Sequence, residues 1–483
     1  MRDVYVIAVH TIKFGKYLDM GIKDLVAATV VPCLREAGIA RRDLAALWFA
    51  NSGWGYARGQ ESIRGQVALR PLGIDGIPIT NIENACAGGS TAFHHAWLGV
   101  ASGLYDITMA VGAEKVHHHN KYKIFAGFLG GLDIENISRI IADLSRFGMD
   151  DDDRRRMAEH VRRYAGSRAH RGGAETKARK GKNGAARYGR MRELGDMFRV
   201  YLQLSEMLGS DTVRDLRKLL TGDHSPFMDV YGFAARWHMR KYGSTIEQLA
   251  AIASKNHLHS SLNPNAQYTF RVTPEEVMAD RLVSWPLTRS MCAPIGDGAA
   301  SAVLCDGDTV RRLGLASRAV RVRASVLGSG RERDFDDIDI GERLSRIAYE
   351  KSGLGPGEIH LAEVHDATAY GELHQAEALG FCAPGEGGVI ALRGETSIGG
   401  RIPINTSGGL ESRGHPIGAS GLAQIHELVT QLRGEAGGRQ VAGARIALAE
   451  NGGGALGQEE AAMCIHILEA PSRGAGMATA GVQ

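Results

Sequence analysis

The chain lacks a strong charge excess and any long hydrophobic run. Its 483 residues carry 57 Lys and Arg against 54 Asp and Glu, which gives a net charge of +3. Nucleic-acid-binding chains usually carry a marked basic excess, so we expect no nucleic-acid partner. No stretch approaches the roughly 18 apolar residues of a membrane span, and the first residues show no secretory pattern. We therefore expect a cytoplasmic protein without a membrane partner.

Cysteine is scarce and scattered. The six cysteines include no CxxC pair, which argues against a zinc ribbon or a disulfide framework and for a reducing compartment. No GxGxxG opens a helix after a strand, so a dinucleotide site is not expected. Three adjacent histidines, at 117–119, cannot easily face one ion, and we expect a solvated segment there and no metal site.

Strand and helix patterns alternate along most of the chain, which predicts an α/β fold. Gly is abundant, with 63 residues, and favours tight turns and close backbone approaches. We expect two α/β units of similar layout, with no exact sequence repeat. The predicted strands are 3–9, 45–50, 79–84, 106–114, 282–287, 299–305, 319–327, 359–364, 445–449 and 461–468, and the predicted helices are 22–37, 88–104, 229–242, 245–257, 337–352, 370–380 and 418–433.

A basic segment interrupts the first unit. We assign 1–115 plus 228–310 to the N-terminal half, 116–227 to an insertion and 318–469 to the C-terminal half, and we expect 470–483 to be disordered. Residues 154–192 hold many Lys and Arg but only two acids. A flexible solvated insertion explains this composition; the alternative is a flap that attracts CoA phosphates or an acidic partner. Its flanks, 137–144 and 197–208, are predicted to be helical.

The first candidate for chemistry is Cys86, at a predicted strand-to-helix turn followed by Gly88 and Gly89. The positive end of a helix dipole and free N–H groups favour a thiolate. Taken alone, such a cysteine could equally be an inert core residue.

The second candidate is His415, in the run Gly414-His-Pro-Ile-Gly-Ala-Ser-Gly421. Pro416 can preset the first helical turn and hold the imidazole rigidly, where it could accept a thiol proton. A purely structural histidine is the alternative.

Two further strand ends carry polar groups. His365 follows one strand and could donate to a thioester oxygen, with Asp366 fixing its tautomer. The glycine run after Glu450 and Asn451 offers N–H groups for an oxyanion hole. Together the cysteine and the two histidines form a far more specific set than any one of them.

These motifs resemble those of thiolases. The resemblance covers roughly 1–115 and 228–468, and the histidine run matches the thiolase motif residue for residue. Tyr242-Gly-Ser-Thr, Asn263-Pro-Asn-Ala and His365-Asp366 resemble the sterol-carrier-protein-type thiolases, because ordinary thiolases carry Asn-Glu at the last position. The resemblance implies two similar βαβαβαββ halves in a five-layered αβαβα arrangement, with an inserted, partly helical loop domain.

The resemblance also implies residue roles. Cys86 would hold the acyl group, His415 would activate it, and His365 would complete an oxyanion site with His415. The N–H groups of Cys86 and Gly452 would form a second hole, with Asp366 and Asn451 in support. Coenzyme A would be a co-substrate, with no permanently bound cofactor, and a homodimer or homotetramer is implied.

One position departs from the family pattern. Ordinary thiolases use a second cysteine as the acid/base at the α-carbon; here that position is Glu450, or Asn451 if the strand is shifted by one. Sterol-carrier-type enzymes can place this cysteine after His-Asp, but Ala367 stands there. Glu450 is our leading substitute, since burial could raise its pKa for proton transfer. A structural hydrogen bond or ion pair is the alternative.

Three functions follow as hypotheses. The first is an acyl-CoA C-acyltransferase that cleaves or forms a 3-oxoacyl-CoA through an S-acyl cysteine. The second is retro-aldol or aldol chemistry on a 3-hydroxyacyl-CoA. The third is a non-catalytic thiolase-like subunit; some relatives work with a small zinc-ribbon/OB-fold CoA-binding protein, and the missing thiols make such a partner plausible here.

Overall fold

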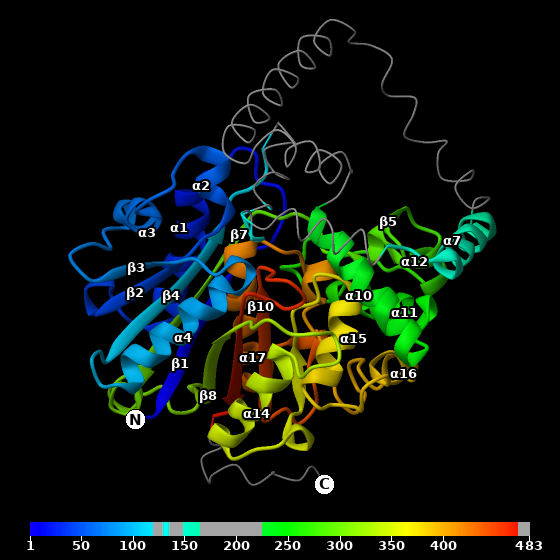
Figure 1. The fold of residues 1–483 in the computed structure, drawn as a ribbon. Helices are drawn as coiled ribbons and strands as arrows, with labels where there is room; N and C mark the ends of the chain where they lie inside the picture. The colour runs from blue at the N-terminus through cyan, green and yellow to red at the C-terminus, as the bar shows by residue number, and fades with distance from the viewer. Residues whose placement is uncertain (119–127, 129, 134, 136–147, 165–224, 472–483) are drawn as a thin grey trace, which may run out of the picture.

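The computed structural model describes residues 1–118, 128, 130–133, 135, 148–164 and 225–471. Within these ranges the chain builds one nine-stranded sheet in the order β3-β2-β4-β7-β1-β8-β11-β10-β9, together with a separate two-stranded hairpin (Figure 1). The strands are β1 Val4–Thr11, β2 Ala46–Ala50, β3 Ile79–Ile82, β4 Ile107–Glu114, β7 Gly298–Asp306, β8 Val320–Ser329, β9 Leu361–Glu363, β10 Ile446–Gly453 and β11 Ala462–Glu469; β5 Leu282–Ser284 and β6 Leu287–Thr288 form the hairpin.

The sheet is built twice from one pattern, as the sequence predicts. In the N-terminal half β1 is antiparallel to β7, β7 is antiparallel to β4, and β4, β2 and β3 are parallel. In the C-terminal half β8 is antiparallel to β11, β11 is antiparallel to β10, and β10 is parallel to β9. A parallel bridge from Ala362 to Ile404 stands where a fifth strand would lie. A short β1–β8 pairing at Tyr5 and Val6 joins the halves.

Helices separate the two half-sheets into layers. Apolar side chains of the central helices α4 (Gly88–Ala101) and α17 (Ser420–Arg433) share one core with inward-facing residues from both half-sheets. A second core lies under α1 (Ile22–Ala37) and a third under α14 (Ile340–Ser352). The order is therefore helix, sheet, helix, sheet, helix, the predicted five layers of the thiolase fold. A fourth core joins α10 (Pro226–Tyr242), α11 (Ile246–Ser260), α12 (Pro274–Met278) and α15 (Ala369–Ala378).

The remaining helices of the described residues are short or peripheral. They are α2 Gly53–Arg58, α3 Arg64–Leu69, α7 Asp151–Tyr164, α13 Gly307–Arg312 and α16 Gly387–Leu392, and none of them was predicted from sequence. The predicted helices at 137–144 and 197–208 and most of the basic segment lie outside the described residues, as does 472–483 of the predicted tail. The domain boundaries thus stay predictions. No helix among the described residues is long and apolar enough to cross a membrane.

Glycine lets the two central helices begin side by side. A Cβ on Gly89 would lie 3.0 Å from the carbonyl oxygen of Gly418, and one on Gly421 would lie 2.6 Å from the backbone nitrogen of Ser90. A Cβ on Gly112 of β4 would come within 2.1 Å of the same Gly418 oxygen. Because only glycine allows backbones to approach so closely, these residues bring the turn before α4 against the turn before α17. Those two turns carry Cys86 and His415.

Candidate active site

Cys86 lies in the 3₁₀ turn η3 (Ala85–Ala87) between β3 and α4. Ala85 has a left-handed φ of 45°, a conformation that costs a non-glycine residue free energy, and its N–H donates to the Glu83 carboxylate at 2.9 Å. On the other side, a Cβ on Gly453 of β10 would lie 2.3 Å from the nitrogen of Ala87 and 2.8 Å from that of Cys86. The turn that carries the thiol is therefore held by the Glu83 carboxylate on one side and by β10 on the other.

His415 contacts the thiol directly. Its Nε2 lies 3.1 Å from Cys86 Sγ, and its Nδ1 lies 2.7 Å from Ser420 Oγ. The Ser420 hydroxyl donates its hydrogen to the carbonyl of Pro416 at 3.0 Å. Since that hydroxyl can then only accept, Nδ1 of His415 carries the ring hydrogen and Nε2 is a bare acceptor facing the S–H. Nε2 is thus set to take the proton of the thiol.

Both partners rest in their neutral forms. Burial, with the Glu114 and Glu83 charges adding to it, raises the pKa of Cys86 to about 12, although the N–H groups of Cys86 and Gly454 act the other way. Burial, followed by the neighbouring His365, holds the pKa of His415 well below its ordinary value. Burial thus acts against the thiolate that we expected the helix N-terminus to favour. A thiolate arises only when the imidazole takes the proton.

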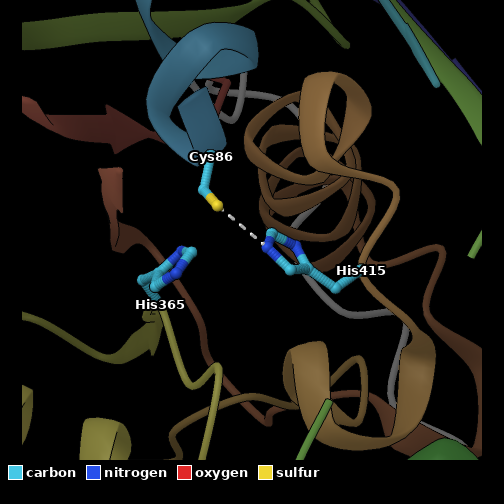
Figure 2. A group of neighbouring side chains, drawn as sticks. All are labelled: Cys86, His365 and His415. Carbon is cyan, nitrogen blue, oxygen red and sulfur yellow. Dashed lines mark hydrogen bonds between the residues drawn. The ribbon is translucent and has the colours of Figure 1, made fainter. Parts of the chain in front are cut away.

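His365 faces this pair from the end of β9. Its ring centroid lies 5.3 Å from that of His415, and one ligand atom of each of Cys86, His365 and His415 lies within 4.8 Å of the others (Figure 2). Asn451 Nδ2 donates to His365 Nδ1 at 2.9 Å, which leaves the hydrogen on Nε2. Burial lowers the pKa of His365 to about 4. A neutral N–H donor therefore stands opposite the nucleophile.

Asp366 does not orient His365. Its carboxylate instead accepts from the N–H of Leu410 at 2.6 Å and from Asn256 Nδ2 at 3.1 Å. The tautomer-fixing contact that we expected from Asp366 belongs to Asn451. Successive side chains at the end of a strand point in different directions, so the Asp366 carboxylate points away from the imidazole of the preceding residue, His365.

Glu450 lies behind the histidine and is completely buried. Its Oε2 accepts from the backbone N–H of His365 at 2.8 Å, and its Oε1 has no hydrogen-bond partner among the described residues. Burial raises the pKa of Glu450 to about 8. The contact with His365 is the structural hydrogen bond that we gave as the alternative role of Glu450. The raised pKa agrees with the leading expectation, which is proton transfer by Glu450.

The glycine run also supplies a donor at the sulfur, while the oxyanion-hole role that we expected of Gly452 stays a prediction. The N–H of Gly454 acts on the Cys86 sulfur, whereas a Cβ on the predicted Gly452 would meet the Glu460 side chain at 3.0 Å. The strand β10 continues to Gly453, four residues beyond its predicted end. That longer strand shifts the turn, so Gly454 is the glycine that enters it.

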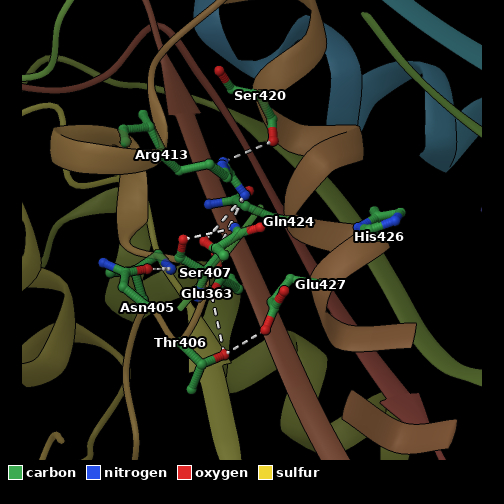
Figure 3. Close-up of polar contacts among 12 residues, drawn as sticks. Glu363, Asn405, Thr406, Ser407, Arg413, Ser420, Gln424, His426 and Glu427 are labelled. Atoms are coloured by element: carbon green, nitrogen blue, oxygen red, sulfur yellow. Dashed lines mark hydrogen bonds and ion pairs between the residues drawn. The ribbon is translucent and has the colours of Figure 1, made fainter. Parts of the chain in front are cut away.

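A buried polar network fixes both histidine-bearing segments (Figure 3). Glu363, at the end of β9, accepts from the N–H and hydroxyl of Ser407 at 2.9 and 2.6 Å and pairs with Arg413 at 3.4 Å. Arg413 Nη2 also donates to the carbonyl of Ser420 at 3.4 Å, and Gln424 of α17 donates to the Glu450 carbonyl at 2.9 Å. The ends of β9, α17 and β10 therefore form one connected unit around the catalytic candidates.

A pocket of about 320 Å³ opens beside His365, although neither Cys86 nor His415 is among its lining residues. His365 and Gly454 form part of its wall, and Glu460 lies in the same wall. Its other walls are rich in aromatic rings, most of them from α10: Phe227, Tyr231, Phe233, Trp237, Phe335 and Tyr370. A mostly apolar pocket with a few convergent polar groups is the usual form of a small-molecule site.

Sequence reasoning found the three central residues and missed their neighbours. Ser420 and Gly454 belong to motifs that we singled out, but their individual contacts depend on strand register and turn geometry. Tyr231 and Glu460 lie in stretches without a chemical motif, and no signal in the sequence marks them. The thiol and two imidazoles could also hold a soft metal ion such as zinc. In the predicted histidine run, His117 pairs with Asp297 at 3.3 Å.

Comparison with known proteins places these features in one family. The profile of the thiolase N-terminal domain matches residues 4–131, and that of the thiolase C-terminal domain matches residues 331–468. An acetyl-CoA acetyltransferase of Methanothermobacter thermautotrophicus is 34% identical over 95% of this chain and 98% of its own length. The benzoylsuccinyl-CoA thiolase subunit BbsB of Thauera aromatica is 30% identical over 91% of each chain.

Human sterol carrier protein 2 is 33% identical over 82% of this chain but only 60% of its own length. Two solved structures share the fold. An Ltp2–ChsH2(DUF35) aldolase superposes with a TM-score of 0.67 at 19% identity, over 98% of each chain. Human mitochondrial 3-ketoacyl-CoA thiolase superposes with a TM-score of 0.59 at 15% identity, over 97% of this chain and 99% of its own.

Proposed function

The chain belongs to the thiolase family of acyltransferases, and from that premise we propose that it is an acyl-CoA C-acyltransferase with an S-acyl-Cys86 intermediate. The observation that carries this proposal is the 3.1 Å contact between Cys86 Sγ and a bare His415 Nε2. A nucleophile within hydrogen-bond reach of a base, with the base oriented by a third group, is the arrangement that covalent catalysis needs. Here the third group is the Ser420 hydroxyl.

In the first half-reaction His415 takes the thiol proton while the sulfur attacks the thioester carbonyl. The N–H groups of Cys86 and Gly454 stabilise the resulting oxyanion; the removal of one such donor typically slows an enzyme by about 10²–10³. The tetrahedral intermediate then expels the CoA thiolate, which accepts the proton from His415. Because both groups begin neutral, the proton returns without leaving a buried charge.

In the second half-reaction an enolate carbon attacks the S-acyl carbonyl and forms the C–C bond. In the reverse direction Cys86 attacks the 3-oxo carbonyl, the C–C bond breaks, and CoA then takes the acyl group from the sulfur. Nε2–H of His365 is free to donate to the carbonyl oxygen of the second substrate, because Asn451 occupies Nδ1. The developing enolate oxygen would lie between His365 and His415. Substrates are therefore CoA thioesters, with CoA as co-substrate.

A second candidate reaction is aldol or retro-aldol cleavage of a 3-hydroxyacyl-CoA. The observation in its favour is that the cluster of the described residues around Cys86 contains one sulfur and two imidazoles, with no second thiol. The close fit of the thiol to His415 favours acyl transfer, since a retro-aldol reaction needs no S-acyl intermediate.

We also propose that the chain assembles with other subunits. The relative from Thauera aromatica is named as one subunit of a thiolase, and the aldolase structure includes a DUF35 protein. A small zinc-ribbon/OB-fold CoA-binding partner would fit these relatives, and a homodimer or homotetramer would fit the family. A thiolase-like subunit without activity of its own is the remaining alternative.

Intact-protein mass spectrometry tests the central proposal. The protein is incubated with acetyl-CoA and with longer and aromatic acyl-CoA thioesters, alongside Cys86→Ser and, as a matched control, Cys382→Ser. We expect a mass increase equal to one acyl group in the wild type and in Cys382→Ser, and none in Cys86→Ser. Product formation that survives Cys86→Ser would favour the aldolase. If neither adduct nor product forms even with a partner present, the chain is a non-catalytic subunit.

A further inference from the structure

The bond-forming step needs a group that removes a proton from the α-carbon, and the sequence-based candidate is poorly placed for it. Glu450 is completely buried, and its Oε2 accepts from the backbone N–H of His365. A base must come within hydrogen-bond reach of the carbon acid in the bound substrate. A carboxylate sealed behind the His365 backbone does not meet that requirement.

Glu460 does face the pocket. It precedes β11, and its Cγ lies 3.0 Å from the position that a Cβ on Gly452 would take. Gly452 is two residues from the position where ordinary thiolases carry the second cysteine. Glu460 lies in the same pocket wall as His365 and Gly454. Its side chain therefore lies beside β10, facing the pocket, two residues from the expected acid/base position.

The surroundings keep this carboxyl group able to exchange protons. Among the described residues Glu460 forms no ion pair, in contrast to Glu459, which pairs with Arg333 and Arg343. Burial raises the pKa of Glu460, and the nearby His374 charge opposes that rise. His374 is itself paired with Asp339 at 2.7 Å. An unpaired carboxyl group in a partly apolar pocket can accept a proton without first breaking a salt bridge.

We propose that Glu460 is the catalytic acid/base that takes and returns the α-carbon proton, in place of the missing second cysteine. This inference rests on the proposed function, since it assigns the second half-reaction of the same site. Tyr231 of α10 lies in the same pocket wall as Glu460, and burial, followed by the Glu460 charge, raises the pKa of its phenol well above its ordinary value. Tyr231 thus stays a neutral donor beside the carboxylate.

The step balances as follows. The Glu460 carboxylate removes one proton from the methyl carbon of an acetyl-CoA, and the electron pair forms the enolate held by His365 and His415. The enolate carbon attacks the S-acyl carbonyl of Cys86, the C–C bond forms and the C–S bond breaks. The proton that Glu460 removed ends on the departing sulfur, so the step restores both the Glu460 carboxylate and the Cys86 thiol. In thiolysis the Glu460 carboxyl group returns its proton to the leaving α-carbon.

Separate assays of the two half-reactions test the role of Glu460. Acylation of Cys86 by acetyl-CoA is followed by mass spectrometry, and exchange of the acetyl methyl hydrogens is followed in D₂O. We expect Glu460→Gln to acylate within about twofold of the wild type and to lose at least about 100-fold in hydrogen exchange, the usual size of a general-base effect. Glu460→Asp should retain more exchange than Glu460→Gln, because it keeps a carboxylate set back by one methylene.

Two controls make the result decisive. Glu350→Gln on the exposed face of α14 should match the wild type in both assays, and Glu450→Gln should lose less hydrogen exchange than Glu460→Gln. Loss of exchange in Glu450→Gln with normal exchange in Glu460→Gln would overturn the assignment. Equal, undiminished exchange in Glu460→Asp and Glu460→Gln would overturn it as well. A wild type that exchanges but never acylates Cys86 would instead refute the proposed function.

Discussion

At the residue scale, the pair of Cys86 and His415 works from a neutral resting state. Many reactive cysteines are thiolates stabilised by a nearby cation or a helix N-terminus. Here burial raises the pKa of the thiol to about 12 and keeps the imidazole uncharged. Proton transfer therefore accompanies attack and does not precede it. Such a thiol resists adventitious oxidation and alkylation, since those reactions need the thiolate.

That resting state predicts the pH dependence of alkylation. Because the thiolate fraction of Cys86 is small at neutral pH, its reaction with iodoacetamide should accelerate about tenfold per pH unit from pH 7 to 9, without a plateau. Peptide mapping by mass spectrometry measures the rate at Cys86, with a reference peptide whose ordinary cysteine levels off near its pKa of about 8.5. A rate at Cys86 that is already constant below pH 7 would mean a resting thiolate–imidazolium pair.

The sequence was sufficient to single out the three side chains that the structure brings together, but not their partners. Cys86, His415 and His365 belong to motifs whose residue types and local turns are fixed by the chemistry. Asn451 rather than Asp366 orients His365, and Gly454 rather than Gly452 acts on the sulfur. The second difference follows from the extra length of β10, and the first from the direction in which successive side chains point on a strand. A shift of one residue reverses that direction, and composition does not encode the register.

At the element scale, the strand β10 forms a surface against which the nucleophile turn packs. The run of glycines is required there because the backbone of η3 occupies the space where side chains would be. A Cβ on Gly453 would meet the backbone atoms Ala87 N, Asn84 O and Cys86 N, the farthest of them at 2.8 Å. Backbone atoms held by β3 and α4 cannot rotate away as a side chain could.

We therefore expect Gly453→Ala to displace the turn that holds Cys86. A shift of about 1 Å in a reacting group can cost about 100-fold in rate, and overpacking typically costs about 1–3 kcal/mol of stability. Acylation of Cys86 should fall at least about 100-fold, as timed acylation assays would show. Circular dichroism should show that the protein stays folded. Gly357→Ala is the matched control, since a Cβ there meets nothing within 4 Å. Normal acylation in Gly453→Ala would contradict this packing argument.

The elements themselves were largely predictable. The helix expected at 22–37 is α1 with the same bounds, and the strand expected at 106–114 is β4 at Ile107–Glu114. The helix carries an apolar period and ends at Gly38, and the strand is a short, mostly apolar run. The strand β10 was predicted too short, because its last residues are polar and glycine-rich and are held in the sheet by pairing with β11. That pairing is a tertiary effect which a local pattern does not contain.

At the scale of the whole molecule, the duplication explains why the site lies at the centre. Each half contributes a turn that precedes its central helix, and the close approach of α4 and α17 joins the two turns. Several buried carboxyl groups lie at this junction and hold the loops between the halves. Glu411, Glu363 and Glu450 are all completely buried. Burial raises the pKa of Glu411 to about 8, that of Glu363 to about 7 and that of Glu450 to about 8.

These groups make stability fall as the pH rises through neutrality. A carboxyl group whose pKa is raised on folding stabilises the fold fully below its unfolded pKa of about 4.5 and loses that contribution as the pH rises to its folded pKa. Buried histidines with lowered pKa, such as His365, give the opposite slope, but only below pH of about 6.5. Buried cysteines begin to matter above pH of about 8.5. The interval from pH 7 to 8 therefore isolates the carboxyl groups, together with His374, whose raised pKa acts with the same sign.

Glu411→Gln tests this account, since it keeps the shape of the side chain and removes its titration. Glu411 accepts from Asn256 Nδ2 at 2.8 Å, and its charge raises the pKa of Asp366. We expect the wild-type Tm to fall by about 1–2 °C from pH 7 to 8, as about 1 kcal/mol implies for a chain of this size, and the fall to shrink in Glu411→Gln. Differential scanning fluorimetry measures it, with the exposed Glu435→Gln as control. A Tm that rises over this interval, or an unchanged slope in Glu411→Gln, would mean that Glu411 is ionised throughout, with Lys255 sustaining its charge at the junction.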